Sequence, residues 1–314
     1  MSTQNDTAPQ ANPNSSGGGP VVAIVLGVII IIAAVVLVMT VGQKDLPANE
    51  AQAKEPAKKE QPRDEQKRTE QSKSESAAAA PADDVASHLQ AAKEYADKTI
   101  GSKQPQGAEA LAIELPNPAF PGTPKAIPAG ARMKPLTGKE RGAYFLPKDL
   151  AATLTNVALD KPVTSSDASP LIGDLEQITD GDKEPLDGRW VELAPGKQWV
   201  QIDLGRPYEA FAINIWHNHI EARIYKDVVV QVSDDPDFVS PITVFNNDFD
   251  NSSGFGEGED YEYFENYEGL LVPLYNPETG KGLAFRYVRA WSKGSTSDDA
   301  NHYTEIEVWA RESK

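Results

Sequence analysis

The second half of the chain, from about residue 151, consists of short segments in which apolar and polar residues alternate. Residues 199–205 (WVQIDLG) place Val, Ile and Leu at every second position, and residues 228–232 are rich in valine. Side chains of a strand point alternately to opposite faces, so a period of two predicts strands with one buried face. Further segments of this kind, separated by turn-forming residues, are 211–215, 242–245, 269–274, 286–290 and 304–308. About seven or eight short strands without helical periodicity between them predict an all-β, antiparallel sandwich over residues 151–311.

The last two of these segments enclose a polar loop. The stretch between residues 290 and 304 is rich in Gly, Ser, Asp and Asn, which favour turns. We therefore expect residues 286–309 to form a hairpin whose two strands lie in the sheet.

Residues 21–42 form an apolar run that contains no charged residue. At about 1.5 Å per residue, a helix of this length spans the roughly 30 Å of a hydrocarbon core. The run lacks the basic flank and the nearby cleavage site of a signal peptide, so we expect one uncleaved transmembrane helix. Lysines and arginines follow the run and none precedes it, which favours a cytoplasmic C-terminal region. The β-sandwich predicted over residues 151–311 favours the opposite, extracytoplasmic side of the membrane, and we place the C-terminal region there.

The rest of the first half has the composition of connecting segments. Residues 1–20 are rich in Asn, Ser, Gly and Pro, and we expect a disordered tail. Residues 43–110 are rich in Ala and in charged residues, which predicts a linker with a short helix over residues 84–98. Prolines recur through residues 111–150, which predicts an extended arm that lies along the sandwich.

Charge limits the classes of ligand. The whole net charge of −17 is carried by residues 151–314, and the chain contains no cysteine. Such a surface repels the phosphates of nucleic acids and suits neutral ligands or cations. The absence of cysteine excludes disulfides and thiol catalysis.

Five motifs occur in order in the second half: NVALDKPVTSS (156–166), ITDGD (178–182), WVQIDLG (199–205), RYVR (286–289) and TEIEV (304–308). Together they resemble the discoidin domain, also called the coagulation factor V/VIII type C domain, which is similar to the family 32 carbohydrate-binding modules. The resemblance covers about residues 156–310. It implies an eight-stranded, galactose-binding-like jelly roll with a ligand surface formed by loops at one end.

The resemblance also implies a structural calcium ion. The ligands carried over are two side chains of the ITDGD turn, one glutamate of the last strand and two main-chain carbonyls: Asp180, Asp182, Glu305, Gln177 and Thr304. Calcium takes six to eight oxygen ligands, and a tight turn with glycine lets such oxygens converge. Pro185 stands where the family often has threonine, and Asp187 is a substitute. The alternative is that residues 180–182 form an ordinary Asx turn.

A ligand surface is expected where aromatic, His and Arg side chains fall on strand ends and loops. The candidates are Trp216, His217, His219, Arg223, Trp291, His302 and Tyr303. Aromatic faces stack on the apolar side of sugar rings, while His and Arg form hydrogen bonds with hydroxyl groups. The alternative is that the tryptophans belong to the core.

Two cation sites are weaker alternatives. His217, His219 and His302 would make a zinc site, with Glu221 as the base of a hydrolase. The acidic residues 246–268 would form either a solvated loop or a second cation site. No nucleophile elbow and no H-E-x-x-H motif occurs in the sequence, so catalysis is not predicted.

The sequence thus predicts a membrane-anchored, non-catalytic module that binds carbohydrate or another cell-surface ligand through loops. The alternative is an interaction domain that docks on a partner protein, with the proline-rich arm in the interface. A metal-dependent hydrolase is the more remote alternative.

Overall fold

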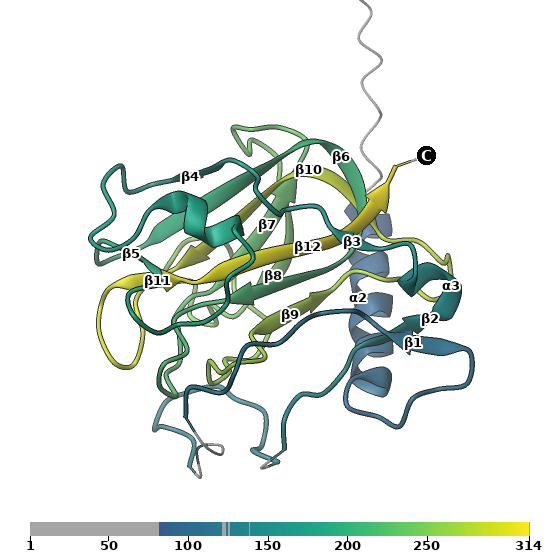
Figure 1. Ribbon diagram of the computed structural model, residues 1–314, viewed down its shortest axis with the longest axis horizontal. Helices are drawn as coiled ribbons and strands as arrows, with labels where there is room; N and C mark the ends of the chain where they lie inside the picture. Colours follow the sequence, from purple (N-terminus) through teal and green to yellow (C-terminus); the bar gives the residue numbers. More distant parts are fainter. Residues whose placement is uncertain (1–81, 121–123, 125, 138, 314) are drawn as a thin grey trace, which may run out of the picture. The chain divides into compact units, whose positions relative to one another are not determined.

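The computed structural model describes residues 82–120, 124, 126–137 and 139–313 (Figure 1). The expected tail, the expected transmembrane helix at 21–42 and most of the expected linker lie outside these residues. Within the described ranges, no helix combines the length and the apolar character needed to cross a membrane.

One long strand, β6 (Gln198–Trp216), organises the sandwich. Its first half pairs with β4 and β10, and β7 and β8 continue the sheet beyond β10. Its second half pairs with β9 and β12, and β3 lies beyond β12. The bounds of these partners are β3 Thr155–Asn156, β4 Val163–Ser165, β7 Val229–Ser233, β8 Ile242–Asn246, β9 Leu270–Pro273, β10 Leu283–Ser292 and β12 Glu305–Glu312. All the pairings are antiparallel, so the predicted all-β sandwich is confirmed.

The core lies between the two halves of this sheet. Apolar residues from both halves of β6 belong to one buried cluster with residues of β7, β9, β10 and β12 (Figure 1). The sequence predicted separate strands at 199–205 and 211–215, whereas the structure has one strand across both. Gly205 takes a positive φ of 88°, but the chain only bends there and the pairing with β10 resumes at Tyr208.

The predicted hairpin at 286–309 is wrong. Strands β10 and β12 both exist, but they lie on opposite sides of β6 and do not pair with each other. The polar loop between them contains a further strand, β11 (Asn301–Tyr303), which pairs with β5 (Val191–Leu193) in a separate two-stranded sheet. The loop therefore connects the two sides of the sandwich across one of its ends.

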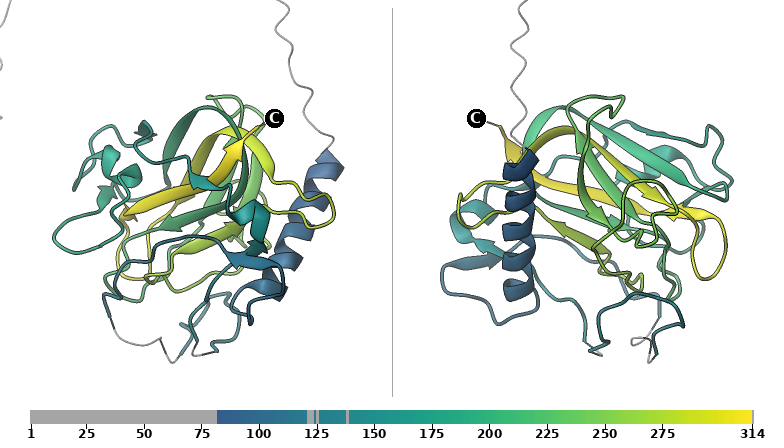
Figure 2. Two further views of the ribbon diagram at one scale, coloured as in Figure 1. Left: turned by 45° about the vertical axis from the view of Figure 1, so that its right-hand side comes forward. Right: turned by 180° about the vertical axis from the view of Figure 1, so that it is seen from behind.

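A layer formed by residues before the sandwich covers the outer face of β6, β9 and β12. It contains α2 (Ala82–Thr99), β1 (Ala108–Ala110), β2 (Phe145–Pro147) and α3 (Lys148–Ala151). We call these elements the N-terminal layer; Figure 2 shows α2 along one side of the sandwich. A second buried cluster joins the two parts: Ala96, Leu111, Tyr144, Leu146, Leu150 and Leu154 pack with Phe211, Ala212, Leu271, Tyr275 and Trp309.

The helix expected at 84–98 is thus α2, and it is docked on the sandwich. Its His88 Nε2 lies 2.9 Å from the Leu274 carbonyl oxygen, and the Tyr95 hydroxyl donates to the Phe145 carbonyl oxygen at 3.1 Å. Lys93 pairs with Asp260 at 2.7 Å. A domain boundary at residue 151 would separate His88 from Leu274 and Lys93 from Asp260.

The proline-rich segment is also held to the sandwich. Arg132 N–H donates to Glu262 at 2.6 Å, and residues 133 and 262 form a parallel bridge. Further along, the buried carboxylate of Glu268 accepts the N–H groups of Arg141 and Gly142 at 2.5 and 2.8 Å.

Replacing Glu268 by Ala is expected to loosen this segment. The change leaves two main-chain donors unsatisfied beside the Arg141 guanidinium, whose pKa is already lowered by burial. We expect a loss of about 1–3 kcal/mol in the free energy of unfolding and faster proteolysis near residue 140. Limited proteolysis and thermal unfolding measure both, with the exposed Glu278→Ala as the control. Equal cleavage rates in the two variants would contradict this role for Glu268.

Candidate functional site

The turn at residues 180–182 meets the last strand, as the resemblance implies. The 3-10 helix η1 (Leu175–Thr179) leads into this turn, where Gly181 has a positive φ of 86°. The Gly181 N–H donates to Oε2 of Glu305 at 3.1 Å. Glu305 is fully buried, and burial is the main reason why its pKa rises to about 9. Its Oε1 is buried and has no hydrogen-bond partner among the described residues.

A cation would fit part of the implied calcium set. The unpartnered oxygen of Glu305 lies near the carboxylate of Asp180, which adds to the rise in the pKa of Glu305, whereas Lys183, which pairs with Glu307, acts against that rise. Asp182 fits less well, because Arg189 binds its Oδ2 at 2.7 Å and the Glu184 N–H binds its Oδ1 at 3.0 Å. The Asp180 Oδ1 accepts the Asp182 N–H at 2.8 Å, so the alternative Asx turn is also present.

Strands β5 and β11 lie together at one end of the sandwich (Figure 1). Charged side chains from three segments meet there. Arg223 donates to Glu221 at 2.9 Å and to Asp298 at 3.1 Å. His302 lies 3.1 Å from the Tyr225 hydroxyl and 3.3 Å from a carboxylate oxygen of Glu192. We call Glu192, Glu221, Arg223, Asp298 and His302 the loop cluster. Burial lowers the pKa of His302, which favours its neutral form.

Apolar as well as polar residues lie close in sequence to the members of the loop cluster. Exposed large apolar side chains occur on the same or adjoining segments: Leu171, Ile172, Leu186 and Ile220. The main chain of Leu171 and Ile172 pairs with that of Glu192. This end of the sandwich therefore offers fixed hydrogen-bonding groups beside apolar surface.

Two predicted ligand residues belong to the core. Trp216 and Tyr303 are fully buried, and neither ring has a face open to a ligand. The Trp216 Nε1 donates to the Tyr267 carbonyl oxygen at 2.8 Å, and the Tyr303 hydroxyl lies 3.2 Å from Ser292 Oγ. The prediction that these two residues contact a sugar is therefore wrong, because both are part of the buried interior.

The other predicted residues lie in three different places. Arg223 and His302 belong to the loop cluster. His217 lies beneath it, stacked on Tyr225 with ring centroids 4.3 Å apart and paired with Glu265 at 3.0 Å. His219 is buried, and its Nε2 lies 2.9 Å from the Lys183 carbonyl oxygen. Trp291 is not part of this end, because it projects from the outer face of β10 beside Trp199.

The histidines do not form the alternative zinc site. Among the described residues, the potential ligands that approach closely enough to share an ion are Asp227, Asp248 and Asp250. In that group Asp227 accepts the hydroxyls of Ser252 and Ser253, and Asp248 accepts their N–H groups. These bonds order the acidic loop locally without requiring an ion.

Sequence reasoning missed three residues at this end. Glu192 lay outside every segment predicted as a strand, Asp298 looked only like a loop former, and Trp190 has a buried Nε1 without a hydrogen-bond partner among the described residues. The one sequence feature that could have drawn attention to this end of the sandwich was the tryptophan within the polar stretch 187–190. Asp298 and Arg223 are 75 residues apart, so no local spacing reveals their pairing.

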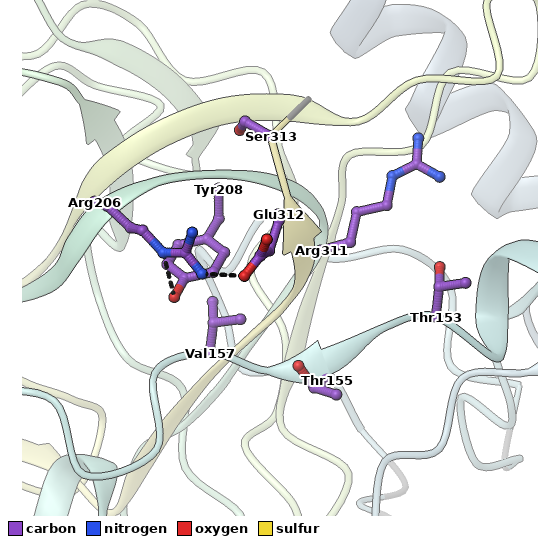
Figure 3. Close-up of a pocket in the computed structure, with 8 residues that line it drawn as sticks. All are labelled: Thr153, Thr155, Val157, Arg206, Tyr208, Arg311, Glu312 and Ser313. Carbon is purple, nitrogen blue, oxygen red and sulfur yellow. Dashed lines mark hydrogen bonds and ion pairs between the residues drawn. The ribbon is translucent and has the colours of Figure 1, made fainter.

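Two cavities lie elsewhere. One, of about 590 Å³, is at the end of the sandwich near the last strand, and Figure 3 shows the side chains that line it. Its two arginines are neutralised, since Arg206 pairs with Glu312 and Arg311 pairs with Glu209. The other, of about 1240 Å³, lies between α2, the proline-rich segment and residues 259–273.

Comparisons with known proteins find a family match over part of the second half of the chain. Residues 177–267 match the F5/F8 type C family model described as a NedA-like, galactose-binding domain. A search of curated protein sequences finds no match.

Three binding modules are among the solved structures that match part of this chain. A chitosan-binding module of a Paenibacillus sp. IK-5 chitosanase/glucanase is 19% identical, covers 49% of this chain and 98% of its own, and has a TM-score of 0.33. A Streptococcus pneumoniae fucose-binding module is 18% identical, with 51% and 100% covered and a TM-score of 0.35. A Clostridium perfringens CBM32 module in complex with GlcNAc-α-1,4-galactose is 18% identical, with 51% and 96% covered and a TM-score of 0.36. Residues 177–267 thus match the F5/8 type C, galactose-binding-like family that the five motifs of the second half resemble.

Proposed function

We propose that this protein binds carbohydrate without chemical conversion, through the loop cluster at the end of its sandwich. The observation that carries the proposal is the set of ion pairs that fixes Arg223 between Glu221 and Asp298. The exposed carboxylates of Glu221 and Asp298, which the buried Arg223 guanidinium holds in place, can accept hydrogen bonds from sugar hydroxyls without further ordering. The match to a galactose-binding domain supports the same class of ligand.

The proposal includes attachment to a membrane through residues 21–42, with the sandwich on the extracytoplasmic side. The support is the apolar run itself, which is long enough to cross a bilayer. Protease access to residues 43–81 in intact cells tests the orientation, and protection of these residues would place the sandwich in the cytoplasm.

We also propose that calcium has a structural role beside η1. Asp180 and Glu305 would hold it, with the carbonyl oxygens implied by the family resemblance, and Asp182 would first have to release Arg189. The ion would supply the positive charge that the buried carboxylate of Glu305 lacks.

Replacing Asp298 by Ala is expected to weaken glycan binding at least tenfold. Its side chain is 43% exposed, so the fold should tolerate the change, while Arg223 loses one of its two partners. A glycan array identifies the best ligand of the full-length chain, and calorimetry compares the variant with wild type. Asp299→Ala, one residue further along the same exposed loop, is the matched control.

Two results would contradict this function. One is an Asp298→Ala variant that binds the selected glycan as tightly as wild type does. The other is a wild-type chain that binds no glycan but captures the same protein partner reproducibly, which would favour a protein-interaction domain.

A further inference from the structure

A strip of aromatic, amide and cationic side chains lies on the outer face of strands β6, β10 and β7. Its members are Trp199, Gln201, Gln231, Arg289 and Trp291, and we call them the outer strip. Trp199 is the register partner of Trp291, and Arg289 is opposite Gln201 on one side and Gln231 on the other. Their neighbours in sequence, such as Val200 and Ala290, point into the core, so the strip points outward.

The rings of the strip lie edge to face or tilted against one another, with two cations beside them. Trp199 and Trp291 have ring centroids 6.2 Å apart, and the Arg289 guanidinium carbon is 4.5 Å from the Trp199 centroid. Phe255, from the acidic loop, lies 4.7 Å from Trp291. Lys197 Nζ is 4.8 Å from the Phe255 centroid and 5.4 Å from the Trp291 centroid. A positive charge therefore stands beside each tryptophan.

Hydrogen bonds hold these side chains in place before any ligand arrives. The Arg289 Nε donates to the Gln201 Oε1 at 2.9 Å, and the Trp291 Nε1 donates to the Gln231 Oε1 at 3.1 Å. Groups that are already fixed lose little conformational entropy when a ligand binds. Arg289 also lies 4.0 Å from the Phe238 centroid, so contacts within the protein are enough to explain its position. The same contacts leave both tryptophans partly exposed to solvent.

The chemistry of the strip suits sugar rings that carry a carboxylate. Indole faces stack on the apolar faces of sugar rings, amides bind hydroxyls, and Lys197 and Arg289 complement a negative charge. A single-stranded nucleic acid would also stack on such rings. However, the net charge of −17 in this half of the chain repels a polyanion, whereas a short acidic sugar experiences mainly charges within about 10 Å.

We propose that the outer strip is a second binding site, specific for acidic oligosaccharides and separate from the loop cluster. It uses other strands and other side chains, so it does not depend on the function proposed for that cluster.

The test measures binding by the quenching of tryptophan fluorescence and by calorimetry, on the full-length chain purified in detergent. The probes are tetragalacturonate, a hyaluronan tetrasaccharide and sialyllactose, with neutral lactose and galactotetraose for comparison. We expect at least one acidic probe to bind at least tenfold more tightly than the neutral sugars. Trp199→Ala and the charge reversal Lys197→Glu should each weaken that binding at least tenfold. Lys281→Glu, an equally exposed charge reversal in the turn before β10, should leave it unchanged.

The two proposed sites can fail separately. Asp298→Ala should leave binding of the acidic probe intact, and Lys197→Glu should leave binding at the loop cluster intact. The outer strip is not a glycan site if none of the acidic probes binds at millimolar concentration. The same conclusion follows if Lys197→Glu and a folded Trp199→Ala both bind the acidic probe like wild type, or if only a proline-rich peptide or an oligonucleotide binds.

Discussion

A chain that starts at residue 151 is expected to aggregate, whereas a chain that starts at residue 82 should remain soluble and unfold cooperatively. The shorter chain contains every strand of the sandwich, so the sequence pattern alone would suggest that it is complete. It lacks the N-terminal layer and leaves the outer face of β6, β9 and β12 uncovered.

The expected effect is large because of what that face contains. Phe211 is fully buried, and Tyr275 and Trp309 are 6% and 8% exposed, against partners that include Tyr144 and Leu146. Burial of one large apolar side chain contributes about 1.5–3 kcal/mol, and a whole domain is stable by only about 5–15 kcal/mol. Exposing several such side chains together would remove most of that stability and create an apolar surface patch that promotes aggregation.

Size-exclusion chromatography and thermal unfolding compare the two chains. A milder variant, Leu146→Ala in the chain that starts at residue 82, tests the same contact without truncation. Leu146 is fully buried, so we expect a loss of about 2–5 kcal/mol in the free energy of unfolding. The N-terminal layer would be only an accessory if the chain from residue 151 were monomeric with an unchanged melting temperature.

Calcium is expected to stabilise the wild-type protein and to leave a Glu305→Gln variant unaffected. A ligand present at a hundred times its dissociation constant adds about 2.7 kcal/mol, and EDTA should remove this contribution. Without calcium, the Glu305→Gln variant is expected to be more stable than the wild type, because the wild type then buries a carboxyl group with one unpartnered oxygen. We expect the variant to be more stable by about 1–3 kcal/mol near pH 8 in EDTA.

The pH dependence of the calcium-free protein follows from the same group. The pKa of Glu305 is raised from its ordinary value of 4.5 to about 9 in the folded state. Between these values unfolding releases a proton, so the free energy of unfolding of the wild type falls as the pH rises. The Glu305→Gln variant should lack this decline, while Glu176→Gln on the exposed side of η1 should retain it. Melting curves from pH 5 to 9, with calcium and with EDTA, measure both effects. If calcium shifts the melting curves of wild type and Glu305→Gln equally, the ion does not bind at this site.

Period-two alternation was sufficient to predict the sandwich, because it depends only on which side chains face the core. Val200, Ile202 and Leu204 do point inward, as do Ile306 and Val308. Alternation does not specify which strand pairs with which. Only the loop that contains β11 connects β10 to β12 in sequence, yet β6 lies between these two strands in the sheet, and this arrangement depends on packing across the whole core.

The site was harder to predict than the fold, because burial depends on parts distant in sequence. Lys183 Nζ pairs with the carboxylate of Glu307 on β12 at 2.6 Å. The same lysine lies 5.3 Å from the centroid of the Trp216 ring, which was expected in the ligand surface and is fully buried. The motif around residues 178–182 did predict the approach of Glu305 to Gly181, since a family pattern carries long-range information that composition lacks.

Strand β6 also has a consequence for how the domain forms. Its partners range from Val163 at one end of the domain to Glu312 at the other, and neither side of the core is complete without it. Because these pairings join distant parts of the chain, the entropy of closing long loops must be overcome before most native contacts form. We therefore expect slow folding in a single transition, with no stage at which one half of the sandwich is folded and the other is not.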